Sequence, residues 1–126
     1  MRPARFCSDE RGTTVLEFAL TVPIFFTLLF GVVGGGLLLW MQLGLQHGAE
    51  MAARCASINA TVCGSVSSIQ SYAASKTFGL NPSPSVFSVT TPACGKQVSA
   101  SYSFQFITSY LGMPSLMLDA KSCFPT

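Results

Sequence analysis

The sequence predicts an α+β protein in which one long N-terminal helix crosses a membrane and carries a small sheet domain on its outer part. Three observations lead to this prediction. Residues 18–41 contain no charged side chain, helical character continues from residue 13 to about residue 57, and apolar and polar residues alternate after residue 86. We expect a long helix, one short helix and a small three-stranded antiparallel sheet packed on the long helix.

The apolar segment is long enough to span a bilayer, whose hydrocarbon core of about 30 Å requires roughly 20 helical residues. As a buried core helix it would need protein on all sides, and a chain of 126 residues is too short to provide that. A cleavable secretory signal is the alternative interpretation. Such signals have a shorter apolar core and a small-x-small cleavage site, whereas this core is longer and has Glu17 at its start.

The charges on either side of the span predict its orientation. Before the span lie three basic residues, Arg2, Arg5 and Arg11, and soon after it lie only His47 and Arg54. The positive-inside rule therefore places the N-terminus in the cytoplasm and the C-terminal domain in the periplasm of a single-pass inner-membrane protein. Trp40 stands at the far end of the span, where an aromatic ring suits the membrane interface.

Composition excludes one class of partner. The net charge of +2 is small, and the basic residues form no patch with interleaved aromatic residues. Nucleic acid is therefore not an expected partner. The lipid bilayer is an expected partner because of the span.

The five cysteines fit the same topology. Cys7 precedes the span and belongs to the reducing cytoplasm, whereas the other four follow it: Cys55, Cys63, Cys94 and Cys123. No pair has C-x-x-C spacing and the chain has one histidine, so we expect neither a metal site nor a cofactor. A redox or nucleophilic role for Cys55 or Cys94 is a further hypothesis, but it would need a free thiol and a base nearby.

Four cysteines outside the membrane predict two disulfides, which allow three connectivities. Cys55 ends the long helix and Cys63 just precedes the short one, so a chain reversal brings them together. Cys94 precedes the central strand and Cys123 ends the last strand, and an antiparallel pair places these two points side by side. We therefore expect the bonds Cys55–Cys63 and Cys94–Cys123.

The chain after the long helix contains one short helix and three strands. Ser65, Ser67 and Ser68 are candidate N-caps of the helix, and its expected buried side is Ile69, Tyr72, Ala73 and Phe78. Gly79 and the stretch 81–84 end it. The apolar face of the strands is expected to comprise Phe87 and Val89, then Val98, Ala100, Tyr102, Phe104 and Phe106, and finally Leu116, Leu118 and Ala120.

One motif stands at the membrane boundary, reading Arg11-Gly12-Thr13-Thr14-Val15-Leu16-Glu17-Phe18-Ala19-Leu20. A glycine closes a short leader, and the fifth residue after it is a glutamate followed by an aromatic residue and a long apolar segment. This resembles the type IV prepilin processing signal. Further matching pieces are Pro23, Ala52-Ala53-Arg54-Cys55, and the distal segment from Cys94 through Val98 to Cys123-Phe124-Pro125. With these pieces, nearly the whole chain resembles the TadE-like pseudopilins of Tad (Flp) pilus assembly.

The resemblance implies a function and its site residues. Residues 1–12 would be a leader that prepilin peptidase removes after Gly12, so that the mature chain begins at Thr13. Glu17, followed by Phe18, would take part in assembly. The implied function is a non-catalytic minor pseudopilin that works with other pseudopilins and inner-membrane components of the assembly machine. Residues 13–57 would be the long helix, and residues 58–126 the periplasmic domain.

Alternatives remain at this stage. Glu17 is also what a helix dipole favours in a first turn, although a carboxylate at the mouth of a membrane helix usually marks function. The family often has a second acidic residue in the span, where this chain has Gly31-Val32-Val33-Gly34-Gly35-Gly36, and Asp9 and Glu10 are unusual in a leader. The alternative function is an uncleaved, signal-anchored extracytoplasmic binding or adhesion domain.

Overall fold

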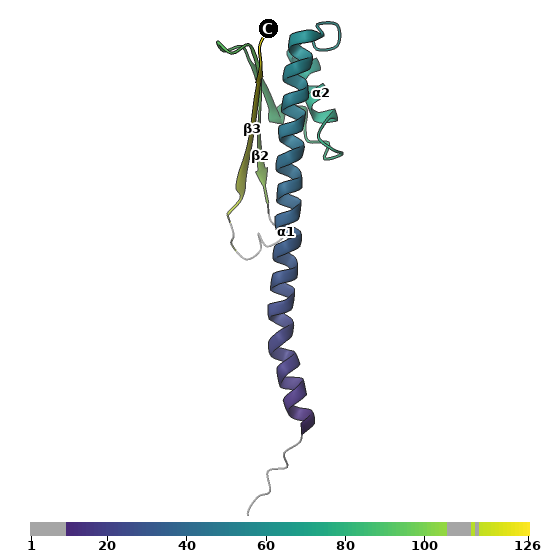
Figure 1. The fold of residues 1–126 in the computed structure, drawn as a ribbon, viewed down its shortest axis with the longest axis vertical. Coiled ribbons are helices and arrows are strands. Elements are labelled where there is room, and N and C mark those ends of the chain that lie inside the picture. The colour runs from purple at the N-terminus through teal and green to yellow at the C-terminus, as the bar shows by residue number, and fades with distance from the viewer. Residues whose placement is uncertain (1–9, 106–111, 113) are drawn as a thin grey trace, which may run out of the picture. The chain divides into compact units, whose positions relative to one another are not determined.

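The structure is a computed structural model, and it describes residues 10–105, 112 and 114–126 (Figure 1). The elements in chain order are α1 (Glu10–Ile58), α2 (Val66–Ser75), the 3-10 helix η1 (Pro84–Val86), β1 (Phe87–Thr90), β2 (Lys96–Phe104) and β3 (Leu116–Phe124). The predicted α+β class, with one long helix, one short helix and a three-stranded antiparallel sheet, is confirmed. Contacts divide the chain into two units, Met1–Gly35 and Gly36–Thr126. Most of the expected leader, with Cys7, lies outside the described residues, as does Phe106.

Helix α1 begins at Glu10, three residues before the expected start, and continues through Pro23 to Ile58. Two threonine hydroxyls in its apolar part donate hydrogen bonds to carbonyl oxygens one turn earlier. Thr21 Oγ1 bonds to the Glu17 oxygen and Thr27 Oγ1 to the Pro23 oxygen, each at 2.7 Å. These hydroxyls are thus satisfied inside the helix, as an apolar surrounding requires.

The last four turns of α1 form one wall of the core in the unit Gly36–Thr126. Their buried residues recur at helical spacing: Leu45, Ala49, Ala52 and Ala53. Glu50 and Arg54 lie on exposed positions of the same turns. Because the buried positions of these turns, with Gly44 and Gly48, are mostly alanine or glycine, the backbone of α1 lies close to whatever packs on it.

Helix α2 starts with a capping box. The Ser65 hydroxyl accepts from the Ser68 N–H (3.2 Å), and the Ser68 hydroxyl accepts from the Ser65 N–H (3.1 Å). Of the three candidate serines, Ser65 is therefore the N-cap. The helix buries Ile69 and Ala73 as expected, together with Ala74.

The prediction that Phe78 belongs to the buried side of this helix is wrong. Helix α2 ends at Ser75, and the chain then turns through left-handed backbone at Phe78 (φ 51°) and Gly79 (φ 81°). This turn removes Phe78 from the buried face and leaves it 52% exposed, while Thr77 is fully buried. The Thr77 hydroxyl is satisfied by the Ala74 carbonyl oxygen at 2.7 Å.

Two glycines of α1 let the end of α2 approach closely. A Cβ on Gly44 would lie 2.6 Å from Leu80 Cδ1 and 3.0 Å from the Thr77 oxygen. A Cβ on Gly48 would lie 2.8 Å from both the Ala73 oxygen and Thr77 Cγ2. Only glycine fits at position 48, because an added Cβ would meet the backbone oxygen of Ala73.

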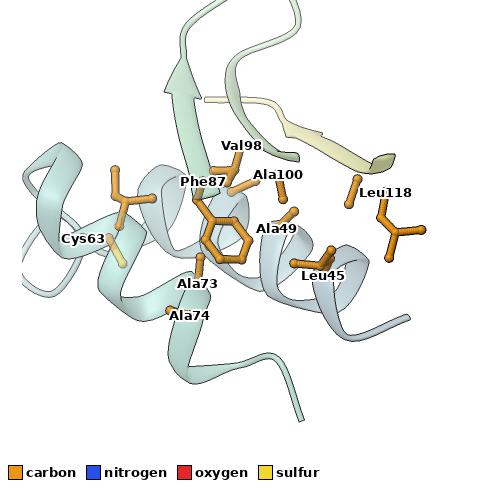
Figure 2. Close-up of a cluster of buried hydrophobic side chains, with 13 residues drawn as sticks. Leu45, Ala49, Cys63, Ala73, Ala74, Phe87, Val98, Ala100 and Leu118 are labelled. Carbon is orange, nitrogen blue, oxygen red and sulfur yellow. The ribbon is translucent and has the colours of Figure 1, made fainter. Parts of the chain in front are cut away.

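The sheet is an antiparallel meander in the order β1-β2-β3. Val89 pairs with Val98, and Ala100 pairs with Ala120. One face turns to the helices with Phe87, Val98, Ala100, Leu118 and Ala120, all buried. In Figure 2 the Phe87 ring lies at the centre of this cluster, between Ala73 of α2 and Ala49 of α1.

Glutamine side chains of the helices cover backbone groups of both edge strands. Gln42 Nε2 donates to the Asp119 oxygen (2.8 Å), and Gln46 bonds to both the carbonyl oxygen (3.2 Å) and the N–H (3.3 Å) of Lys121 in β3. Gln70 of α2 donates to the Phe87 oxygen of β1 at 2.6 Å. These contacts occupy groups through which an exposed edge would pair with another chain.

Two disulfides close the domain. Cys55 is joined to Cys63, with Cα atoms 5.8 Å apart, and Cys94 to Cys123, with Cα atoms 6.4 Å apart. This is the pairing expected from the sequence. The register explains the second bond, because Gln97 of β2 lies opposite Cys123 and the turn before β2 carries Cys94.

We predict that Gly48→Ala destabilises the domain by about 1–3 kcal/mol, because the new methyl group overlaps the Ala73 carbonyl and Thr77. Thermal unfolding of the detergent-solubilised protein, followed by circular dichroism, measures the effect. The control is Gly36→Ala, since a Cβ there meets nothing within 4 Å. Equal melting temperatures for the two variants would contradict the close packing of α2 on α1.

Removing the two disulfides should have unequal effects. The bonds close loops of sequence separation 29 and 8, and the chain-entropy model gives about 3.6 and about 2.6 kcal/mol respectively. We expect the double variant Cys94→Ala/Cys123→Ala to unfold at lower denaturant concentration than Cys55→Ala/Cys63→Ala. Non-reducing peptide mapping of the wild-type chain tests the pairing itself, and a peptide joining Cys55 to Cys94 would refute it.

Candidate functional site: the processing motif and the apolar helix

The motif residues lie together in the first turns of α1. Gly12, Thr13, Glu17 and Phe18 are all exposed, and Phe18 is 71% exposed. Thr13 and Glu17 are four residues apart in the helix, so they share one face at a rise of about 6 Å. A new α-amine at Thr13 would thus be one turn from the Glu17 carboxylate.

The peptide bond between Gly12 and Thr13 lies inside the helix rather than before it. The first turn of a helix lacks half of its hydrogen bonds and opens readily. Glycine lowers helix stability by about 1 kcal/mol relative to alanine, and a Cβ at Gly12 would meet nothing within 4 Å. Gly12 is therefore not required by packing, and its physical effect here is to weaken the first turn at the expected cleavage point.

In the described part of the unit Met1–Gly35, the large apolar side chains of α1 are exposed. Twelve large apolar side chains there are 43–76% exposed: Val15, Leu16, Phe18, Leu20, Ile24, Phe25, Phe26, Leu28, Leu29, Phe30, Val32 and Val33. A continuous apolar surface of this size is rare on soluble proteins and marks contact with a membrane or a partner. By length and composition α1 qualifies as a membrane-crossing helix, and it indicates single-pass anchoring.

Three glycines of the segment that replaces the second acidic residue of the family have open space around them. A Cβ on Gly31, Gly35 or Gly36 would meet nothing within 4 Å. Packing within the chain therefore does not require these glycines, and their spacing allows close approach of another helix.

No group of three histidine, cysteine, aspartate or glutamate side chains that could hold a metal ion occurs in residues 10–105, 112 and 114–126. The four cysteines of the domain are paired. The histidine is engaged as well, since His47 Nδ1–H donates to the Lys76 carbonyl oxygen at 2.9 Å. The described part of the domain thus offers neither a free thiol nor an unoccupied histidine Nδ1.

Sequence reasoning missed one cluster. The Phe78 ring stacks on His47, with centroids 4.5 Å apart, and contacts Trp40, with centroids 6.1 Å apart. Trp40 and His47 are seven residues apart and share a face of α1, which the sequence does show. The third member was not predictable, because the left-handed turn after α2 brings Phe78 to this face.

Comparison with known proteins matches the same part of the chain. A family model described as TadE-like protein matches residues 12–54, from the glycine of the motif to Arg54, near the end of α1. No curated protein and no solved structure matches the chain. The resemblance inferred from the motif is therefore confirmed over residues 12–54, and this segment is similar to the TadE-like family.

Proposed function

We propose that this chain is a minor pseudopilin of a Tad-type (Flp) pilus or a related secretion system, and that it acts in assembly without catalysis. The observation that carries the proposal is the family match, which begins at Gly12 and includes Glu17. A TadE-like segment implies a component of Tad pilus machinery at a membrane. Other pseudopilins, inner-membrane components of the assembly machine and prepilin peptidase are the proposed partners.

The proposed location is the inner membrane, with the N-terminus in the cytoplasm and the domain in the periplasm. The exposed apolar surface of α1 supports the span. The basic residues before the span, Arg2, Arg5 and Arg11, support the orientation. Two disulfides in the domain support an oxidising compartment for it.

The proposed chemistry is confined to the N-terminus. Cleavage after Gly12 would give Thr13 a positive α-amine on the same helix face as Glu17. A carboxylate in a membrane helix needs a partner of opposite charge or a place at the interface. The amine of the same chain or of a neighbouring subunit provides that partner, and such pairing between subunits would guide assembly.

The mature chain is predicted to begin at Thr13 when prepilin peptidase is present. Intact-mass measurement of the membrane-purified protein should show the loss of residues 1–12. Gly12→Leu should retain them, because a bulky side chain at the cut blocks access and stabilises the first turn. The matched control is Gly36→Leu, outside the motif, which should be processed normally. A wild-type chain that keeps residues 1–12 in cells with active peptidase refutes processing and favours the uncleaved adhesion domain.

Glu17→Ala is predicted to be cleaved and inserted but to support pilus assembly poorly. We expect the number of pili per cell to fall about tenfold or more. The lost charge pair would contribute a few kcal/mol, and each 1.4 kcal/mol corresponds to about a tenfold change in an equilibrium constant. Electron microscopy of complemented cells counts the pili. The control is Glu50→Ala, an exposed carboxylate later in α1. Normal piliation with Glu17→Ala would show that assembly does not need the Glu17 carboxylate.

A further inference from the structure

The aromatic cluster of Trp40, His47 and Phe78 is not explained by the fold or by the processing motif. Phe78 is 52% exposed and Trp40 is 55% exposed, although each contacts another ring. Leu43, three residues after Trp40 on the same side of α1, is 63% exposed. We call Trp40, Leu43 and Phe78 the aromatic patch.

The backbone at the patch indicates that Phe78 is held outward. A bulky residue with positive φ is uncommon, and Phe78 has a φ of 51°. The turn is fixed before Phe78, because Thr77 is fully buried and the His47 ring is bonded to the Lys76 carbonyl oxygen. After Phe78 the Leu80 N–H donates to the Thr77 carbonyl oxygen at 3.2 Å. A large apolar ring is thus kept at the surface by a firmly anchored turn, rather than left there by a loose loop.

The position of the patch along α1 indicates what covers it. The apolar run of the helix ends at Trp40 and Met41, and the next polar side chain is Gln42. The membrane interface is therefore expected at this level. Trp40 and His47 are about 10 Å apart along the helix, and the Phe78 ring contacts both. Phe78 thus falls within the headgroup region that flanks the roughly 30 Å hydrocarbon core.

The charge at the patch fits the same surface. Lys76 lies two residues before Phe78, is exposed, and has its Nζ 5.3 Å from the centre of the Tyr72 ring. An apolar group beside a lysine is the combination with which peripheral segments bind phospholipid, the ring entering the acyl boundary and the ammonium reaching phosphate.

We propose that the 76–80 turn is a second membrane contact: Phe78 inserts beside Trp40 into the outer leaflet interface, and Lys76 binds lipid phosphate. The bilayer then holds the domain at two points, one on α1 and one on the turn after α2. This inference rests on the membrane anchoring within the proposed function. It adds to that anchoring a defined contact between the domain and the lipid surface.

Tryptophan fluorescence in liposomes tests the proposal, because Trp40 is the single tryptophan of the chain. The full-length protein is reconstituted in phosphatidylethanolamine and phosphatidylglycerol vesicles that contain lipids brominated near the headgroup end of the acyl chain. Three proteins are compared: wild type, Trp40→Phe/Phe78→Trp, and the control Trp40→Phe/Ile58→Trp, whose reporter replaces an exposed residue at the far end of α1. We expect quenching at positions 40 and 78 to agree within about twofold, and none at position 58.

The outcomes separate this inference from the proposed function. Quenching at position 40 but solvent-like, unquenched emission at position 78 would overturn the membrane contact and leave the anchoring intact. In that case the patch would be a surface for a protein partner. No quenching at position 40 would contradict the anchoring itself.

A measurement on the wild-type chain covers the case in which the Phe78→Trp variant does not fold. A phospholipid that carries a photoreactive diazirine at the start of its acyl chain is added to the same vesicles. After irradiation and reduction of the disulfides, trypsin releases residues 77–96, between Lys76 and Lys96, and residues 55–76, after Arg54. We expect lipid adducts on residues 78–80 and none on residues 55–75. An unlabelled 77–96 peptide, from a sample with labelled α1, would overturn the proposal.

Discussion

The rest of the structure depends on the close contact between the small-residue face of α1 and the elements that cover it. Gly48 and Ala49 leave room for the end of α2 and for the Phe87 ring, which is fully buried. A large side chain on this face would separate the sheet from the helix and open the core. Because α1 is one helix from Glu10 to Ile58, the same element provides both the apolar surface for the membrane and the wall of the core. The core of the domain is therefore built on the outer part of the same helix that carries the apolar surface.

Local patterns in the sequence predicted the fold class because each element here has a clear period. The alternation from Val98 to Phe104 predicts β2, and the long uncharged segment predicts α1. The motif residues Gly12 and Glu17 likewise stand at a fixed spacing that can be read without a structure. The disulfide Cys94–Cys123 follows from the antiparallel order of strands.

The features that were missed all depend on tertiary contacts. Phe78 was expected on the buried side of the short helix, yet the helix stops at Ser75 and the chain then takes up left-handed backbone. The glutamines that bond to the edge strands, such as Gln46 with Lys121, pair residues far apart in sequence with no compositional signal. The aromatic patch arises for the same reason, since only the folded turn brings Phe78 to Trp40.

In the proposed function, the chain serves pilus assembly through the helix that resembles TadE-like proteins, together with the domain built on it. The most direct measurement is a count of surface pili in the native host after deletion of the chain, with two forms supplied for complementation. One form is the full chain, and the other is residues 36–126 exported behind a cleavable secretory signal. We expect few or no pili after deletion, restoration by the full chain and no restoration by the shorter form. Normal piliation after deletion would show that the chain is not needed for assembly.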